Sequence, residues 1–339
     1  MTDADSVVVV IPFFNGTAFI ERAVRSVINQ TRGAHEIVVV DDGSRDSEAK
    51  ALGALSASLG FEVIRQENAG QSSARNTGVA NSSSPLICFL DQDDYFLPDH
   101  IDKLVSAWST ERSPSVGYVY GDAQRIDLNG DLIHERVIKS HSTHPKVTTV
   151  DFLTSDMFIL PSASIISREM YSVIGGFHPE LRGYEDDDFF LRAHFAGFRG
   201  IHLDLPVVAW TLNPDSSSHS PTMAQSRLVY LRRVNALIAS LPEATRRELE
   251  PHIYPRFVSL FAYDLAAPLA VGNEFAKAES RFHEVVELCR TSGVTVPFNT
   301  RIIIGIMCLL GSLPIPLRRA AARSLLSPQL RKLRASFRR

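Results

Sequence analysis

The first 110 residues repeat one pattern four times: a short apolar run, rich in β-branched residues, is followed by a stretch with helical spacing of its apolar positions. The apolar runs are residues 6–12, 36–42, 61–66 and 85–91, and the helical stretches begin after Asn15-Gly16 and cover 46–59, 72–80 and 99–108. Strands that alternate with helices form a parallel sheet covered on both faces. We expect ligands at the carboxyl ends of its strands.

The chain changes character after this repeat. Residues 116–122 predict a strand, and residues 125–128 and 131–135, joined by Asn129-Gly130, predict a hairpin. The runs FRGIHLD and PVVAWTL, within 198–212, predict paired strands, and from about residue 224 onward the spacing is helical. We therefore expect an α/β domain over residues 1–222 and a helical region over residues 223–339.

The net charge of −3 hides two segments of opposite sign. Nine basic and no acidic residues follow residue 300, whereas residues 1–300 hold 26 basic and 38 acidic ones. Nucleic-acid binding requires basic groups aligned along phosphates, so the acidic body argues against nucleic acid as a partner. The basic tail favours an anionic lipid surface instead.

Residues 302–317 are nearly free of polar side chains, but they are shorter than the roughly 20 apolar residues of a membrane-spanning helix. One interpretation is a buried helix packed on the protein. The other joins this segment to the basic tail, residues 300–339, as an anchor in the plane of a membrane. An acidic N-terminus and three cysteines without CxxC spacing predict a cytoplasmic protein, which the second interpretation places at the inner face of the cell membrane.

Three carboxylates, Asp91, Asp93 and Asp94, lie within four residues at the end of the run PLICFLD. Carboxylates this close repel one another unless a cation neutralises them. Hard oxygen ligands near a phosphate-bearing ligand suit Mg²⁺ or Mn²⁺. A solvated acidic loop before the next helix is the alternative.

Two other strand ends carry candidate binding residues. Asp41-Asp42, followed by Gly43-Ser44, forms either a capped turn or acceptors for a base or ribose. Arg75, in GQSSARNTG (70–78), either makes a surface ion pair or faces the phosphate end of the same cleft.

Residues 185–188 are four consecutive acids at the start of a predicted helix. The helix dipole accounts for one or two of them, at about 0.3–1 kcal/mol each. At least one is a candidate general base, because a carboxylate among others in a cleft has a raised pKa. His219, in the serine-rich run NPDSSSHSP (213–221), is a candidate metal ligand, with a solvated loop histidine as the alternative.

The chain lacks GxGxxG, Walker A, HExxH and GxSxG motifs, so dehydrogenases, P-loop enzymes, zincins and serine hydrolases are not indicated. It resembles instead the family 2 glycosyltransferases of GT-A fold. The similarity covers about residues 6–215 and rests on six motifs in the family's order: VVVVIPFFNG (7–16), EIVVVDDGSRD (36–46), NAGQSSARNTGVA (68–80), ICFLDQDDYFLPDHI (87–101), GGFHPEL (175–181) and YEDDDFFLR (184–192).

The resemblance implies inverting, metal-dependent transfer of a sugar from a nucleotide sugar. Asp93 matches the metal-ligating position of the family's DxD motif, with Mg²⁺ or Mn²⁺ as cofactor. Asp186, beside Glu185, matches the base that deprotonates the acceptor hydroxyl, and the choice among Glu185, Asp186 and Asp187 stays open. The donor-binding residues implied are Pro12, Phe14, Asp41, Asp42, Arg75, Asp91 and Gln92.

We thus expect a GT-A fold, a Rossmann-like mixed sheet with helices on both faces, plus a C-terminal helical region able to form a homo-oligomer interface. The expected activity is a hexosyltransferase-type transfer of one sugar from a UDP-linked donor to a hydroxyl of a glycan or lipid-linked acceptor in surface polysaccharide biosynthesis. The QxxRW motif of processive members is absent, which favours single additions. An inactive nucleotide-sugar-binding or scaffold protein, and another nucleotide-dependent transferase, are the alternatives.

Overall fold

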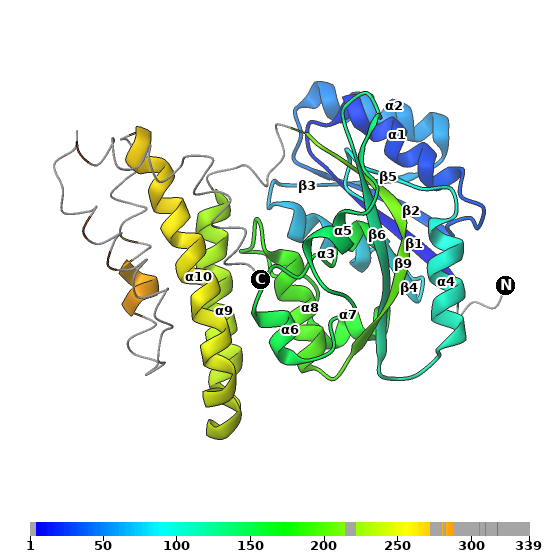
Figure 1. Cartoon of the computed structure of the whole chain (residues 1–339). Coiled ribbons are helices and arrows are strands. Elements are labelled where there is room, and N and C mark those ends of the chain that lie inside the picture. The colour runs from blue at the N-terminus through cyan, green and yellow to red at the C-terminus, as the bar shows by residue number, and fades with distance from the viewer. Residues whose placement is uncertain are drawn as a thin grey trace. The chain divides into compact units, whose positions relative to one another are not determined.

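The computed structural model describes residues 5–213, 222–271 and 283–287, together with the single positions 280, 305, 309 and 317. Its contacts divide the chain into two units (Figure 1). The first consists of residues 1–147 and 157–230, and the second of residues 148–156 and 231–339.

The first unit holds the strands and most of the described helices. Its strands are β1 (Val7–Phe13), β2 (Glu36–Asp42), β3 (Glu62–Gln66), β4 (Leu86–Phe89), β5 (Tyr95–Phe96), β6 (Val116–Ile126), β7 (Leu132–His134), β8 (Ser164–Ser167) and β9 (Arg199–Thr211). Its helices are α1 (Thr17–Ile28), α2 (Asp46–Leu59), α3 (Gln71–Ala80), α4 (His100–Thr110), α5 (Val137–His141), a 3₁₀ turn (Pro161–Ala163), α7 (Arg168–Ile174) and α8 (Glu185–Phe195).

Within the described residues these strands form one nine-stranded sheet in the order β3-β2-β1-β4-β8-β6-β9-β5, with β7 paired to β6. The four strands β3, β2, β1 and β4 are parallel, whereas β8 pairs antiparallel with β4 and with β6. The mixed sheet expected from the sequence is confirmed. Its parallel half brings the carboxyl ends of β1, β2 and β4 to one edge.

Both faces of the sheet are covered, as the uniformly apolar sequence of β1 requires. On one face the apolar stripe of α1, with Ile20 and Val24, packs with α2 and α4 against Val9 and Ile11. On the other face α3 lies close to β1, because a Cβ on Gly78 would come within 2.3 Å of Val10 Cγ1. This close approach fixes where the beginning of α3 meets the strand ends.

The predicted paired strands within 198–212 are wrong: β9 is one strand that runs from Arg199 to Thr211. It pairs in parallel with β6 along its length, and the register shifts near Asp122 and Pro206. Those irregularities accommodate a proline, which lacks an N–H for the ladder, without ending the strand. The continuous strand delivers Thr211 to the same edge as the carboxyl ends of β1, β2 and β4, where it contacts Asp93.

The second unit is helical where it is described. It contains α6 (Thr149–Leu153) and α10 (Glu243–Val271), and α9 (Thr222–Ala239) runs from the first unit into it. Arg256 of α10 forms an ion pair with Asp156 at 2.7 Å. None of the helices in the described ranges combines the length and the apolar character needed to span a bilayer.

Candidate active site

The end of β2 carries two buried carboxylates that organise the neighbouring loops. Asp41 is 1% exposed, and its Oδ1 accepts the Ser44 N–H at 2.9 Å, which forms the turn that the sequence left as one of two alternatives. Asp42 is 4% exposed and accepts hydrogen bonds from the N–H groups of Ala69 and Gly70, both at 2.8 Å. Asp42 therefore anchors the loop that leads into α3. Contact of either carboxylate with a nucleoside stays a prediction.

The acidic cluster after β4 is divided between solvent and core. Asp91 has a side chain 40% exposed, whereas Asp94 is 2% exposed and its Oδ1 accepts the Thr211 N–H at 2.8 Å. Burial and the negative charges of Asp91 and Asp93 raise the pKa of Asp94. Asp93 accepts a hydrogen bond from Asn213 Nδ2 at 3.0 Å, and burial raises the pKa of its carboxyl as well.

Gln92 braces the end of β1 rather than pointing away from it. Its Oε1 accepts the Phe14 N–H at 2.9 Å, and its Nε2 donates to the Phe14 carbonyl at 3.3 Å. Gly16 makes this possible, since a Cβ there would lie 2.2 Å from Gln92 Oε1. The brace leaves the Phe14 side chain 46% exposed at the edge, with Pro12 partly buried in the strand before it.

Arg75 connects the acidic cluster with the acids of α8. Its guanidinium is 2% exposed and donates to Asp91 Oδ1 at 2.7 Å and to Glu185 Oε1 at 3.0 Å. Gln71 Nε2 also donates to Glu185. The surface ion pair considered from the sequence is thus a buried one, and it holds two segments more than 90 residues apart at one place.

The four acids at the start of α8 have different environments. Glu185 is 6% exposed and bound to Arg75, and Asp188 is bound to Arg192 at 2.7 Å. Asp187 is 5% exposed and accepts the Met157 N–H at 3.2 Å. Asp186 is the partly exposed member of the run.

The pKa of the Asp186 carboxyl is strongly perturbed. Burial raises it, and the charges of Glu185 and Asp187 raise it further. Within the described part of the chain its carboxylate accepts one hydrogen bond, from the Asp187 N–H at 2.9 Å. A carboxylate with a raised pKa and open coordination is suited to accept a proton.

The segment before α8 is held in an unusual conformation. Tyr184 has a positive φ of 61°, and its ring stacks on Tyr230 with centroids 5.5 Å apart. Arg227 of α9 donates from Nε to the Tyr184 hydroxyl at 3.1 Å. These contacts orient the backbone immediately before the candidate base.

Sequence reasoning missed the residues that support the acidic cluster from a distance. Thr211 Oγ1 donates to the Asp93 carbonyl at 2.5 Å, and Arg22 Nη2 donates to the same carbonyl at 2.7 Å. Asn213, which donates to the Asp93 carboxylate, was missed in the same way, and so was Gln71, which donates to Glu185 of α8. Because these residues lie more than 70 positions from their acidic partners, no local pattern reveals them. His219 lies outside the described residues.

The donor set at the acidic cluster fits a divalent cation that also binds phosphate oxygens. No group of three His, Cys, Asp or Glu side chains is arranged to hold a metal ion within residues 5–213 and the other described ranges. Mg²⁺ and Mn²⁺ sites that share ligands with a diphosphate need only one or two protein carboxylates. Asp93 is partly exposed, and its raised pKa reflects repulsion and burial that a cation would relieve.

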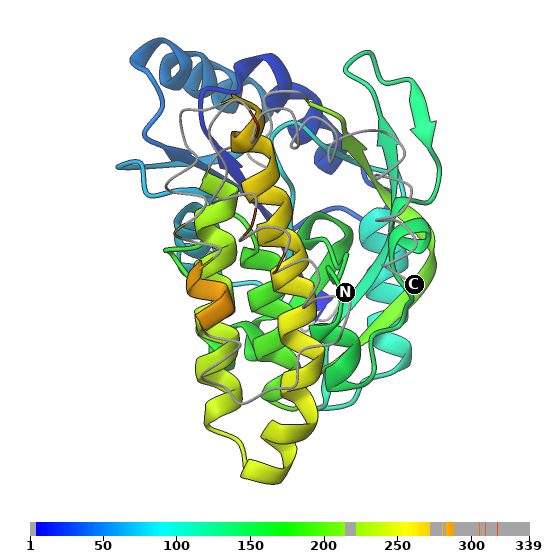
Figure 2. The same cartoon turned by 60° about the vertical axis from the view of Figure 1, so that its left-hand side comes forward.

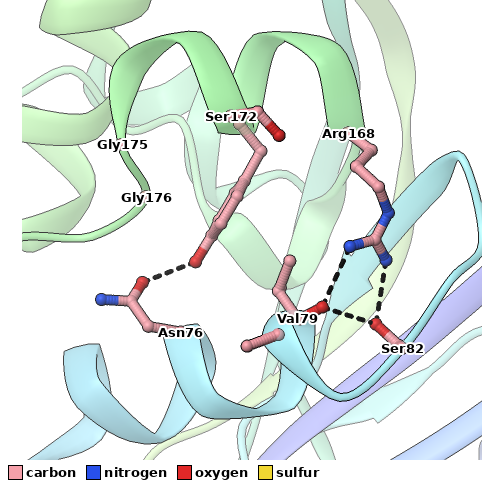
Figure 3. A pocket seen from close by; sticks show the side chains of 9 residues that line it. Asn76, Val79, Ser82, Arg168, Ser172, Gly175 and Gly176 are labelled. Atoms are coloured by element: carbon pink, nitrogen blue, oxygen red, sulfur yellow. Dashed lines mark hydrogen bonds between the residues drawn. The ribbon is translucent and has the colours of Figure 1, made fainter.

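A hollow of about 300 Å³ lies along α3 and α7, lined by Asn76, Arg168, Gly176 and their neighbours (Figure 3). It contains none of the candidate site residues. Arg168 donates to the carbonyls of Ser84 and Val79 and to the Ser82 hydroxyl, so its guanidinium joins these elements. The hollow is separate from the acidic edge.

Comparisons with known proteins agree with this architecture. Residues 8–174 match the family described as Glycosyl transferase family 2. An uncharacterized glycosyltransferase of Haemophilus influenzae is 27% identical over 228 residues, covering 66% of this chain and 75% of the relative. The succinoglycan biosynthesis protein ExoU of Rhizobium meliloti is 28% identical over 293 residues, covering 80% of this chain and 82% of the relative.

A solved structure shares the fold. The crystal structure of S. aureus TarS 1–349 in complex with UDP-GlcNAc has a TM-score of 0.59 and 18% sequence identity, and the match covers 85% of this chain and 92% of that one. Together with the family match, this likeness confirms the GT-A fold expected from the sequence.

Proposed function

Since residues 8–174 match glycosyl transferase family 2 and the chain is a glycosyltransferase, we propose that it moves one sugar from a UDP-linked donor to a hydroxyl of a glycan or lipid-linked acceptor, with inversion at the anomeric carbon. The likeness to a succinoglycan biosynthesis protein supports a role in polysaccharide assembly. The shared fold of a protein crystallised with UDP-GlcNAc supports a uridine nucleotide.

One observation carries the proposal: Asp186 is the acid of the 185–188 run whose carboxylate is left available to accept a proton. Glu185 and Asp188 are bound to arginines, and Asp187 is buried against a backbone N–H. Asp186 is partly exposed, and burial together with its acidic neighbours raises its pKa. A base that must be deprotonated before the reaction and protonated after it works best with a pKa near the working pH.

The proposed reaction uses Asp186 as the base. Asp186 takes the proton of the acceptor hydroxyl while that oxygen forms a bond to the anomeric carbon. The bond between the anomeric carbon and the diphosphate oxygen breaks, and its electron pair leaves with the nucleotide. Attack on the face opposite the leaving group inverts the configuration in a single displacement.

The donor side of the site is built by Arg75 and the acidic cluster. Because one guanidinium holds both Asp91 and Glu185, it keeps the start of α8 beside the end of β4, and with it the neighbouring Asp186. A divalent cation bound at Asp93, with His219 as the further proposed ligand, would neutralise the charge that develops on the departing diphosphate.

The proposal is tested by separating donor binding from transfer. Thermal shifts of the full chain are measured with UDP, GDP and UDP-GlcNAc, each with and without Mn²⁺, because a ligand that binds the folded state raises the melting temperature. We expect a Mn²⁺-dependent shift that Asp93→Asn abolishes and Asp186→Asn preserves. Asp186→Asn should reduce turnover by about 10²–10⁴-fold.

Asp187→Asn is the matched control, since an amide oxygen still accepts the Met157 N–H. It should keep most of the activity. If Asp187→Asn loses turnover and Asp186→Asn retains it, the assignment of Asp186 as the base is wrong. A UDP shift with no transfer to any acceptor would favour the inactive binding protein.

We also propose that residues 300–339 bring the enzyme to an anionic membrane surface, supported by nine basic and no acidic residues after position 300. Truncation at residue 300 should release the protein from phosphatidylserine-containing vesicles in a sedimentation assay. Equal sedimentation of both forms contradicts this assignment.

A further inference from the structure

Four large aliphatic side chains are exposed at the outer end of β6 and β9. Leu128, Leu132 and Ile133 of the β6–β7 hairpin are 49%, 57% and 52% exposed, and Leu212 is 47% exposed. They are half of the eight large apolar side chains that are exposed within residues 5–213. Figure 2 shows the hairpin, in blue-green, projecting from the sheet. A clustered apolar surface of this kind marks a binding site more often than scattered exposure does.

These four residues, called here the hairpin patch, begin beside the acidic cluster. Leu212 lies between Thr211, whose hydroxyl donates to the Asp93 carbonyl, and Asn213, whose amide donates to the Asp93 carboxylate. Its own N–H donates to the Ile126 carbonyl at 2.8 Å. The patch therefore begins, along the chain, between two residues that hold Asp93.

The strand pairing sets how far the patch extends. Ile126 pairs with Thr211 on one side and with Leu132 on the other. Two strand spacings, about 10 Å, thus separate Leu132 from Thr211. This distance is within reach of a chain of roughly eight to ten methylene groups that begins at the acidic edge.

The charges of the hairpin favour a single alkyl chain over an anionic bilayer as the binding partner. Asp127, Asp131 and Glu135 surround the apolar positions. The two flanking cations have partners of their own, because Arg125 lies over the Trp210 ring and Arg136 is paired with Asp122 and Asp204. Asp127 accepts the N–H groups of Asn129 and Asp131 to form the turn. Acidic side chains at the tip would be repelled by anionic headgroups. A single alkyl chain carries no charge, so these acidic side chains do not repel it.

We propose that the hairpin patch binds the apolar chain of a lipid-linked acceptor and so brings the acceptor's sugar to the acidic edge. The inference rests on the proposed function and selects the lipid-linked class from the two acceptor classes that it leaves open. Covering an aliphatic side chain the size of leucine with an alkyl chain contributes about tenfold to affinity.

The test uses the full chain with UDP and Mn²⁺ and two probes, methyl β-D-glucopyranoside and dodecyl β-D-glucopyranoside below its micelle concentration. Calorimetry should show the dodecyl glucoside binding at least tenfold more tightly. Leu132→Asp and Ile133→Asp should each lower the affinity for dodecyl glucoside about tenfold. Val173→Asp, at a position 61% exposed on α7, is the matched control and should change nothing. A diazirine at the end of the dodecyl chain should label residues 128–133 and 212.

Four results overturn the inference. Equal affinities for the two glucosides, or labelling away from the patch, remove the alkyl site. If the patch variants lose vesicle binding but keep dodecyl glucoside binding, the hairpin contacts a membrane. If they change the sedimenting mass instead, it joins copies of the chain. Each of these, with the UDP shift and sugar transfer intact, refutes only this inference, whereas absence of the UDP shift refutes the proposed function.

Discussion

Replacing Arg75 with methionine removes the guanidinium that bridges Asp91 and Glu185 and leaves a chain of similar length. The loss of the guanidinium affects the two carboxylates differently, because the Asp91 side chain is 40% exposed and that of Glu185 is 8% exposed. Water can replace the cation at Asp91, where an exposed pair contributes at most about 1 kcal/mol. Glu185 keeps Gln71 as a donor but becomes an uncompensated buried charge.

Breaking a buried pair in this way costs about 3–5 kcal/mol. Most of that cost belongs to Glu185, so Glu185→Gln in the Arg75→Met background should recover roughly 2–4 kcal/mol of it. The measurement is a double-mutant cycle of the free energy of unfolding in urea. The variant Arg168→Met is the control, since Arg168 donates to carbonyls and a hydroxyl and its removal leaves no buried carboxylate.

Two outcomes would refute this reasoning. Additive effects of the two substitutions, within about 0.5 kcal/mol, would mean that the pair carries no interaction energy. A loss for Arg168→Met as large as that for Arg75→Met would mean that lost packing, not the stranded carboxylate, sets the cost.

Three further outcomes can be measured independently. Gly16→Ala should displace the Gln92 side chain from Phe14 and weaken UDP binding, with a stability loss of about 1–3 kcal/mol; Gln92→Leu removes the same two hydrogen bonds, so UDP titrations of the double variant should show no further loss. Burial raises the pKa of Asp186 above 3.8, so the folded state holds its proton to higher pH than the unfolded chain does. Asp186→Asn should therefore melt at a higher temperature than wild type at pH 7 and at an equal one near pH 3, while wild-type kcat falls as pH decreases through the raised pKa. Thr211→Val removes the hydroxyl that donates to the Asp93 carbonyl and should weaken the Mn²⁺-dependent UDP shift; an unchanged shift means that the loop holds its shape without it.

The local signals of the sequence were sufficient for the α/β architecture. Apolar runs such as residues 6–12 and 36–42 form parallel strands because they are buried on both faces, and the polar residues after them meet at one edge by topology. The paired strands predicted within 198–212 failed for the opposite reason. Whether Pro206 ends a strand depends on the bulges of its partner β6, which no local pattern encodes.

The run of acids at 185–188 shows what was left to the tertiary structure. The sequence places four carboxylates at a helix start and distinguishes none of them, since their spacing and residue type are nearly the same. Arg75 comes from 110 positions away to bind Glu185, and Met157 meets Asp187 from 30 positions away. The pKa and availability of Asp186 depend on which neighbours are taken in this way. Residue types and local periodicity therefore determine the fold and the class of site, whereas long-range contacts decide which carboxylate is available for the chemistry.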